Sequence, residues 1–251
     1  MTEYDAVFFD IGGVIVSLPS IRQGYVDYLE AFAAEYDLEP GPALETWRET
    51  LGEHFKSAEG TEYMSAAEGY QKAFDAIVDG DVTREDWEPG FLQATKAAME
   101  PEPNVVETIQ VLDEAGLYLG IVSDIDTDEA HRMLDLFGLD DSFDGVTTSE
   151  AVGYKKPDRR MFEDALDRAG VDPAGAIHVG DRYDHDMQGA SEMGIRTVAY
   201  NGTAFERAEE IGREGYRVDG DEAIDFAVAD HRELLDVVGV RSADDATGDG
   251  N

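Results

Sequence analysis

Ala6-Val7-Phe8-Phe9-Asp10-Ile11-Gly12-Gly13 is the stretch of sequence that decides the fold. Four consecutive apolar residues that end at a carboxylate are typical of a buried parallel strand, with Asp10 at its carboxyl end. The two glycines allow a tight loop in which the backbone can approach a ligand. Because open parallel sheets bind ligands beyond the carboxyl ends of their strands, this stretch indicates both the sheet and the edge that carries function.

Downstream of Pro101, apolar runs of strand length alternate with segments of helical periodicity. Short links between them predict right-handed βαβ units, so the expected fold class is α/β with a doubly wound, Rossmann-like parallel sheet. Strands are expected at 6–9, 117–122, 143–148, 176–179, 195–199 and 226–229. Helices are expected at 105–112, 129–137, 158–169, 184–193 and 232–238, with Gly116, Gly138, Gly170 and Gly194 ending the first four.

A segment of purely helical character, residues 18–100, separates the first strand from this alternating pattern. Aromatic residues such as Tyr25 and Phe32 recur in it at helical spacing. We therefore predict an all-helical domain inserted into a discontinuous catalytic core that is formed by residues 1–17 and 101–240.

The charge of the chain is strongly negative, with 57 acidic residues against 19 basic ones and a formal net charge of −38. Such a surface repels nucleic-acid phosphates and anionic lipids, so no nucleic-acid partner is expected. No apolar run approaches the roughly 18 residues of a membrane span, so no membrane association is expected either. Residues 241–251 are small and acidic and are expected to form a flexible tail.

This composition also bears on the environment of the protein. An apolar fraction of 42% and clear periodicity argue against disorder, which is one interpretation of high net charge. An acidic surface adapted to molar salt is the better interpretation, because salt screens the self-repulsion. We expect a cytoplasmic protein of a salt-accumulating organism. The absence of cysteine excludes disulfides, thiol nucleophiles and cysteine-ligated zinc.

A second strand end carries Ser123, with Asp124 directly after it. A hydroxyl group and neighbouring backbone N–H groups can hold a phosphoryl oxygen. The alternative is that Ser123 caps the following helix. Asp126 and Asp128 are better candidates for that cap, which favours Ser123 as a binding residue.

Lys155 and Lys156 stand directly before Pro157 and are two of only five lysines in the chain. The residue before a proline is held in an extended conformation, and proline favours the first turn of a helix. This geometry lets a lysine project toward the strand ends, where a cation offsets carboxylates and a bound phosphate. The alternative is a pair of solvated surface lysines, but the scarcity of lysine favours a functional role.

An acidic cluster of Asp181, Asp184 and Asp186 follows Gly180, which ends a further strand. Carboxylates in this position form a site of hard oxygen ligands, which suits Mg²⁺. In a chain with 57 acidic residues the cluster alone is weak support for a metal site. His185 is expected to be structural or exposed, because nothing supplies the other ligands of a zinc site.

Four motifs resemble those of the haloacid dehalogenase superfamily in order, spacing and strand-end placement. They are Phe9 to Val14, Ile121 to Ser123, Gly153 to Asp158, and Gly180 to Asp186 followed by Gly189-Ala190. The resemblance implies that the helical insertion is an α-helical cap of the first subclass. It also implies a hydrolase, most often a phosphatase that acts on a small phosphorylated metabolite.

The resemblance further implies a metal site and a nucleophile. Asp10 attacks phosphorus and forms an aspartyl-phosphate, which water then releases as phosphate. Mg²⁺ is held by Asp10, the backbone carbonyl of Gly12 and Asp181, and Asp186 supports the metal or its waters.

The same resemblance assigns the residues that hold the substrate. Ser123 binds a phosphoryl oxygen, and Asp124 lies beside it. Lys156 neutralises the charge of the nucleophile and the phosphoryl group; it is preferred to Lys155 because it directly precedes Pro157.

Gly12 departs from the superfamily pattern. Phosphatases of the superfamily usually carry an Asp there as general acid and base, and such a group contributes roughly 10²–10⁴-fold in rate. Asp124 or a residue of the insertion is a candidate substitute, and a good leaving group such as an acyl phosphate needs less help. Two other functions stay open: a 2-haloacid dehalogenase, and a catalytically weak protein with a binding or regulatory role. The acidic cluster at Asp181 favours phosphoryl chemistry.

Substrate identity and oligomeric state stay open at this level. Several residues of the insertion are candidates to reach the pocket, and their spacing fits ordinary helix packing equally well. They are Arg22, Trp47, Arg48, Phe55, Lys56 and Tyr63.

Overall fold

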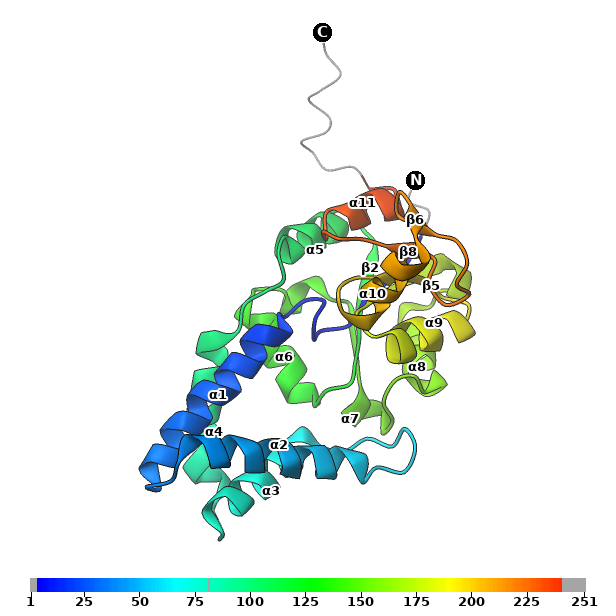
Figure 1. Cartoon of the computed structure of the whole chain (residues 1–251). Helices are drawn as coiled ribbons and strands as arrows, with labels where there is room; N and C mark the ends of the chain where they lie inside the picture. The colour runs from blue at the N-terminus through cyan, green and yellow to red at the C-terminus, as the bar shows by residue number, and fades with distance from the viewer. Residues whose placement is uncertain (1–3, 81, 241–251) are drawn as a thin grey trace.

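A sheet lies at the centre of the structure, a computed structural model that describes residues 4–80 and 82–240. The strands lie in the order β3-β2-β1-β4-β5-β8-β7-β6 (Figure 1). The pairings from β3 to β8 are parallel, and β7 and β6 continue the sheet in antiparallel fashion. The predicted doubly wound parallel sheet is confirmed. The strands are β1 (Ala6–Phe9), β2 (Tyr118–Ser123), β3 (Gly145–Thr148), β4 (Ala176–Gly180), β5 (Arg196–Ala199), β6 (Arg213–Glu214), β7 (Arg217–Val218) and β8 (Phe226–Ala227).

β1 lies in the interior of the sheet because all four of its residues are apolar and buried. Phe9 is in register with Ile121 of β2 and with Val179 of β4. The carboxyl ends of these three neighbouring strands therefore meet at one edge of the sheet. The predicted site residues lie at this edge.

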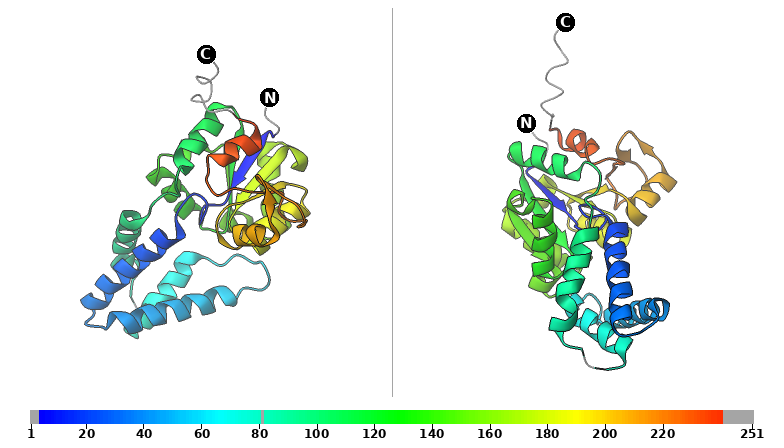
Figure 2. Two further views of the ribbon diagram at one scale, coloured as in Figure 1. Left: turned by 45° about the horizontal axis from the view of Figure 1, so that its top comes forward. Right: turned by 90° about the vertical axis from the view of Figure 1, so that its left-hand side faces the viewer.

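Helices cover both faces of the sheet, because successive residues of a strand point to opposite faces. Val7 and Phe9 share a buried cluster with residues of α5, α6 and α11, and Ala6 and Phe8 share another with residues of α8 and α9. We call the sheet and the helices from α5 to α11 the α/β body (Figure 2). Its helices are α5 (Val105–Glu114), α6 (Thr127–Leu136), α7 (Ser149–Val152), α8 (Arg159–Ala169), α9 (Gln188–Glu192), α10 (Gly202–Ile211) and α11 (Glu233–Val238).

The first four helices form a second cluster beside the α/β body, which we call the helical insertion (Figures 1 and 2). Trp47, Phe74, Trp87 and Phe91 are buried in it and make ring contacts with one another. The insertion thus has an apolar core of its own. Its helices are α1 (Leu18–Glu35), α2 (Pro40–Lys56), α3 (Ala66–Val78) and α4 (Arg84–Ala98).

The chain enters and leaves the insertion through two adjacent segments. Val16 forms a bridge to Pro101, and the Ser17 N–H donates to the Glu100 carbonyl at 3.0 Å. Two connections side by side join the insertion to the α/β body. The expected division into core, insertion and tail stays a prediction, and the predicted tail at 241–251 lies outside the described residues.

Three parts of the chain differ from the sequence-based expectation. The short helix α7, Ser149–Val152, was not predicted. The segment between β5 and β8 received no prediction, yet it forms α10 and the β6–β7 hairpin. The helix expected at 184–193 begins instead as a π-helical turn, Tyr183–Met187, before α9. The hydrogen bonds of a π-turn span one residue more than those of an α-helix, so its residues depart from the helical period used for the prediction, and such turns are frequent at functional sites. None of the helices in the described ranges is long and apolar enough to cross a membrane.

His231 ties the C-terminal part of the α/β body to the loop after β1. Its ring is fully buried against Tyr200, and Nε2 lies 2.8 Å from the carbonyl oxygen of Val14, to which it donates. Burial lowers the pKa of His231 to about 4, although the bond to Val14 and the charge of Asp230 act in the opposite direction. The folded state therefore holds this ring neutral.

The neutral ring predicts a pH dependence of stability. Because the folded pKa lies below the unfolded one, the contribution of His231 is complete above about pH 6.5, falls as the pH falls, and levels off near pH 4. Its full size is about 3 kcal/mol. In denaturant titrations, His231→Gln is expected to lose stability less steeply than the wild type across this window. Parallel pH curves for the two proteins would contradict this assignment.

Candidate active site

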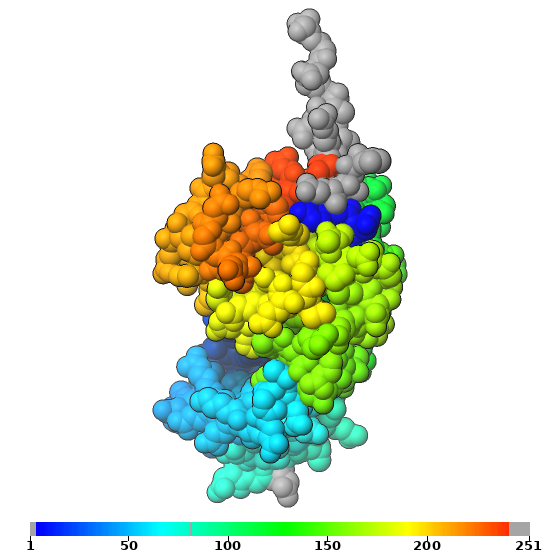
Figure 3. All heavy atoms as spheres, turned by 90° about the vertical axis from the view of Figure 1, so that its right-hand side faces the viewer, coloured from blue at the N-terminus to red at the C-terminus, as the bar shows by residue number. Residues whose placement is uncertain are grey.

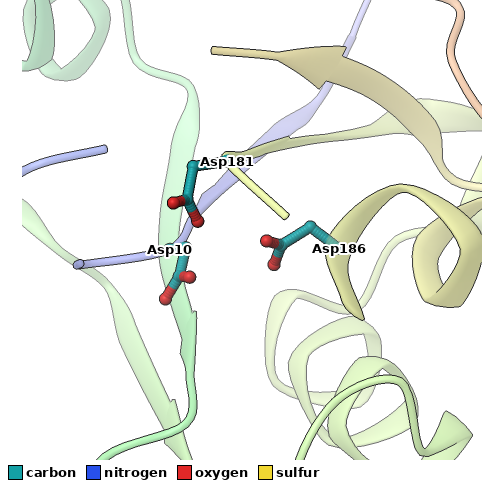
Figure 4. Close-up of side chains that lie close together, drawn as sticks. All are labelled: Asp10, Asp181 and Asp186. Atoms are coloured by element: carbon teal, nitrogen blue, oxygen red, sulfur yellow. The ribbon is translucent and has the colours of Figure 1, made fainter. Parts of the chain in front are cut away.

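Three buried carboxylates gather at the carboxyl ends of β1 and β4. Asp10 follows β1, Asp181 follows β4, and Asp186 belongs to the π-turn beyond it. Oxygen atoms of the three lie within 4.8 Å of one another. Figure 4 shows Asp10 and Asp181 close together, with the carboxylate of Asp186 directed toward them. Asp184, the remaining acid of the predicted cluster, is exposed and takes no part.

Lys156 supplies the positive charge between these carboxylates. Its side chain is fully buried, and Nζ lies 2.5 Å from an oxygen of Asp186 and 3.1 Å from an oxygen of Asp10. It also donates to the Val122 carbonyl at 2.9 Å. Burial opposes the charge of Lys156, but the charges of Asp10, Asp186 and Asp124 outweigh it and raise its pKa. The alternative of a solvated lysine therefore does not hold for Lys156, whereas Lys155 is half-buried.

Asp186 is held as an ionised acceptor. One of its oxygens accepts from Lys156 and lies 3.1 Å from His178 Nε2, and the other accepts from the Arg182 N–H at 3.0 Å. Burial would raise the pKa of Asp186, but Lys156 and His178 lower it well below the ordinary value. With both oxygens engaged, Asp186 is suited to orient its neighbours or a bound water.

Asp181 differs from its two neighbours because one of its oxygens is unsatisfied. Oδ1 is buried and has no hydrogen-bond partner among residues 4–80 and 82–240. Burial and the charges of Asp10 and Asp186 raise the pKa of Asp181 to about 7. A divalent cation would satisfy this oxygen and offset the repulsion among the three carboxylates. The residues present therefore fit Mg²⁺.

Glycines permit this close packing of carboxylates. A Cβ on Gly13 would lie 2.6 Å from an Asp181 oxygen, and Gly13 has φ +78°, which also favours glycine. A Cβ on Gly180 would lie 2.3 Å from the Cβ of Asp186, and one on Gly202 would lie 2.5 Å from the Asp181 carbonyl oxygen. Side chains at these positions would push the carboxylates out of place.

Ser123 and Asp124 end β2 beside Asp10 and have different surroundings. The hydroxyl of Ser123 makes no hydrogen bond within the described part of the chain and faces the same cavity as Asp10. It does not cap α6, which begins after Asp126. The carboxylate of Asp124 accepts from the Lys156 N–H and Arg182, both at 2.7 Å, and lies 3.4 Å from His185 Nδ1. Burial would raise the pKa of Asp124, but His185, Lys156 and Arg182 lower it. Asp124 is therefore an acceptor rather than a proton donor.

The cavity that contains these residues lies between the α/β body and the helical insertion and has a volume of about 370 Å³. Gly12 lines it next to Asp10. Of the six candidates from the insertion, Arg22, Phe55 and Tyr63 line this cavity, and Trp47, Arg48 and Lys56 do not. Sequence reasoning missed Tyr25, Met64, Ala66 and Tyr70, which also line it. The helical spacing of Tyr25 and Tyr70 gave no sign that they face a cavity rather than a core.

Asp126 joins the two parts of the molecule. Of the two cap candidates, Asp126 occupies the N-cap position of α6 as expected and Asp128 does not, but the carboxylate of Asp126 makes no bond to that helix. The carboxylate accepts instead from Tyr63 at 2.7 Å and from the backbone N–H groups of Ala66 and Ala67 at 3.1 and 3.3 Å. It therefore satisfies the first N–H groups of α3, across the interface.

A second contact closes the same side of the cavity. The loop between α2 and α3 lies against the segment that precedes α8, where Lys155 N–H donates to the Thr61 carbonyl at 2.8 Å. The Thr61 hydroxyl donates to Asp158 at 2.7 Å. Figure 3 shows the cyan part of the insertion against the green and yellow parts of the α/β body. The insertion is thus docked over the strand ends.

The family model of haloacid dehalogenase-like hydrolases matches residues 4–194 of this chain. The chain belongs to this family of hydrolases. The matched region contains all the residues gathered at the strand ends. It also contains the whole helical insertion.

Relatives with assigned names include phosphatases. Glyceraldehyde 3-phosphate phosphatase of Methanopyrus kandleri is 36% identical over 57% of this chain and 58% of its own length. The present chain therefore covers less than two thirds of the length of that relative. Pyrophosphatase PpaX of Halalkalibacterium halodurans is 26% identical over 96% of this chain and 99% of its own length.

Solved structures share the fold over nearly the whole chain. A phosphatase of the same superfamily from Thermococcus onnurineus has a TM-score of 0.68 at 24% identity and covers 94% of this chain and 99% of its own. A 2-haloacid dehalogenase from Pseudomonas syringae also has a TM-score of 0.68, at 22% identity, with coverages of 94% and 98%. The fold alone does not separate these two activities.

The buried lysine predicts a large stability difference between two adjacent residues. Lys156→Met is expected to lower the free energy of unfolding by about 3–5 kcal/mol, because it leaves Asp10 and Asp186 buried without their cation. The matched control, Lys155→Met, is expected to change it by less than about 0.5 kcal/mol, because its ammonium group has no bonded partner in the described ranges. Denaturant titration in molar KCl measures both values. Equal losses in the two variants would rule out this account.

Proposed function

We propose that this hydrolase is a magnesium-dependent phosphatase of small phosphorylated metabolites that works through an aspartyl-phosphate on Asp10. The observation that carries the proposal is the buried, unsatisfied oxygen of Asp181 beside Asp10 at the ends of neighbouring strands. An oxygen in that position calls for a cation, and a cation beside a carboxylate nucleophile suits phosphoryl transfer. Relatives that are named as phosphatases support the same reaction class.

The proposed metal ligands are Asp10, Asp181 and the backbone carbonyl of Gly12. Asp186 would act through the waters of the metal, because both of its oxygens already accept hydrogen bonds. When bound, Mg²⁺ neutralises the phosphoryl oxygens and helps to align them for in-line attack. This proposal explains why three carboxylates share one buried site.

The remaining site residues act on the nucleophile and the phosphoryl group. Asp10 attacks phosphorus with a carboxylate oxygen, and the N–H of Ile11, 2.7 Å from the other oxygen, holds its orientation. Lys156 offsets the charge that the nucleophile and the phosphoryl group bring together. The free hydroxyl of Ser123 donates to a phosphoryl oxygen. Asp124 keeps Arg182 at the rim of the cavity.

The helical insertion is proposed to act as the α-helical cap of the first subclass. It closes the cavity on the side opposite the strand ends, and closure excludes water from the reaction. Dehalogenation remains the second candidate. It requires attack of Asp10 on carbon, for which the unsatisfied oxygen of Asp181 has no use.

A first assay tests the proposed reaction. Release of phosphate from p-nitrophenyl phosphate in molar KCl is expected to require Mg²⁺ and to stop in EDTA. Asp10→Asn is expected to abolish it, because the nucleophile is lost. Calorimetric titration with Mg²⁺ gives an independent readout, in which Asp181→Asn is expected to weaken binding strongly. Undiminished turnover by Asp10→Asn would exclude the mechanism.

We propose further that the protein is adapted to a cytoplasm rich in salt. The support is its charge: 57 acidic against 19 basic residues give a net charge of −38. At low ionic strength this charge repels itself and opposes the compact state. In molar salt the Debye length falls to about 3 Å, and most of the repulsion is screened.

The expected result is a melting temperature that rises steeply with KCl. The reason is screening, so an uncharged osmolyte at the same osmolality is the control and is expected to have a smaller effect. Differential scanning calorimetry or near-ultraviolet circular dichroism measures the midpoint. A midpoint that is independent of KCl would refute the adaptation.

A further inference from the structure

The cavity has no side chain at position 12, two residues after the nucleophile. Gly12 lines it, and a Cβ on Gly12 would lie 3.2 Å from Cδ2 of Leu18. Leu18 itself lines the cavity and occupies the space next to this position. The leaving group of a substrate bound at Asp10 would therefore meet a hydrocarbon side chain here, not a proton donor.

Two polar side chains that line the cavity, Asp124 and Tyr63, already take part in hydrogen bonds within the protein. Asp124 accepts three hydrogen bonds and has no proton to give. The hydroxyl of Tyr63 donates to Asp126, which also accepts from two backbone N–H groups. Using either group as an acid would break the contacts that hold the helical insertion or Arg182 in place.

Apart from the proposed metal ligands Asp10 and Asp181, and the guanidinium groups of Arg22 and Arg182, the titratable groups left to consider in the cavity are Tyr25, Tyr70 and Glu129. The hydroxyls of Tyr25 and Tyr70 are 3.0 Å apart and bond to each other. Glu129 keeps a proton near neutral pH, since burial and the charge of Asp126 raise its pKa to about 7. Glu129 also borders a separate groove formed by α4 and α6. Glu129 thus stands on the helical side of the cavity, and Glu129→Gln tests it as an alternative proton donor.

From the apolar wall that Gly12 and Leu18 form beside Asp10, we infer that the substrate is a phosphate ester or anhydride whose leaving oxygen is a weak base. Acyl, enol and aryl phosphates have such an oxygen, and alkyl phosphates do not. The inference rests on the proposed phosphatase function and names its substrate class. A weakly basic oxygen leaves as a stable anion and needs no proton in the transition state. An alkoxide needs one, and the part of the cavity around Asp10 and Gly12 does not provide it.

The chemical balance of the two steps is complete without an acid. In the first, an oxygen of Asp10 bonds to phosphorus, and the electron pair of the breaking P–O bond stays on the leaving oxygen, which departs as a carboxylate, enolate or phenolate. In the second, the oxygen of water bonds to phosphorus, the bond to Asp10 breaks and its electron pair returns to the carboxylate, and both protons of water end on the product phosphate. Because no base assists water either, the aspartyl-phosphate is expected to persist and accumulate.

The apolar lining narrows the class further. Besides Leu18, the walls include Ile21, Phe55, Met64 and Ile125. These side chains favour a leaving group with a hydrocarbon portion over a second phosphate. Organic acyl and aryl phosphates of moderate size fit the cavity of about 370 Å³ better than pyrophosphate does.

The test compares substrates of equal size whose leaving oxygens differ in basicity. The pairs are phenyl with cyclohexyl phosphate and acetyl with ethyl phosphate, in molar KCl with Mg²⁺, and turnover by Asp10→Asn is subtracted. The first member of each pair is expected to show kcat/KM at least roughly 10²-fold higher, the factor that a missing general acid costs. Glyceraldehyde 3-phosphate, an alkyl ester, is expected to behave like the poor members. Acid quenching and mass spectrometry should find the phosphorylated Asp10 peptide during turnover of phenyl phosphate.

Matched variants decide whether the missing acid is the cause. Gly12→Asp combined with Leu18→Ala, which makes room for the new side chain, is expected to narrow the gap within each pair and shorten the life of the phosphoenzyme. A wild-type enzyme that hydrolyses both members of a pair within a few-fold overturns the inference, as does a gap that persists in the double variant. Loss of alkyl phosphate turnover in Glu129→Gln would overturn it too, by identifying the acid. Absence of phosphate release from every substrate, with no phosphoenzyme, would instead reject the proposed function.

Discussion

One buried lysine balances the charges on which the whole site depends. Lys156 lies within 3.1 Å of both Asp10 and Asp186, and neither the lysine nor these carboxylates have appreciable contact with water. Unpaired charges at such depth would cost several kcal/mol each. The lysine comes from the segment before α8, so its position fixes that segment against the ends of β1 and β4. Parts of the chain that are distant in sequence are thereby held in one arrangement.

Glycines and an irregular turn in the backbone around the site make room for this cluster of carboxylates. Gly13 lies in the loop after β1, Gly180 ends β4 and Gly202 begins α10, and each leaves room for an atom of Asp181 or Asp186 that a Cβ would displace. The π-turn after β4 serves the same end, because it directs Asp186 inward while Asp184 stays in solvent. Glycine and an irregular turn both weaken secondary structure. Their presence together at one sheet edge reflects a site whose geometry takes precedence over local stability.

The sequence predicts those features that depend on local pattern. An apolar run that ends in a carboxylate locates β1, and a rare lysine before a proline identifies Lys156, because both signals lie within a few residues. Asp126 shows the limit: its position before α6 is that of a cap, but its partners lie some sixty residues away in the insertion. The same limit applies to Tyr25 and Tyr70, whose helical spacing is identical for a core and for a cavity wall. Contacts across the interface depend on how two units dock, which no periodicity encodes.

The acidic surface and the proposed site have opposite electrostatic effects on an anionic substrate. A chain with a net charge of −38 repels phosphorylated molecules, the proposed substrates of its cavity. The repulsion is long-ranged, whereas the proposed attraction by Lys156, Ser123 and a bound cation would act over contact distances. At molar ionic strength the Debye length is about 3 Å, so the distant surface charges are screened and the contacts within the cavity persist. The acidic surface is therefore compatible with an anionic substrate only under the salt conditions that such a surface itself calls for.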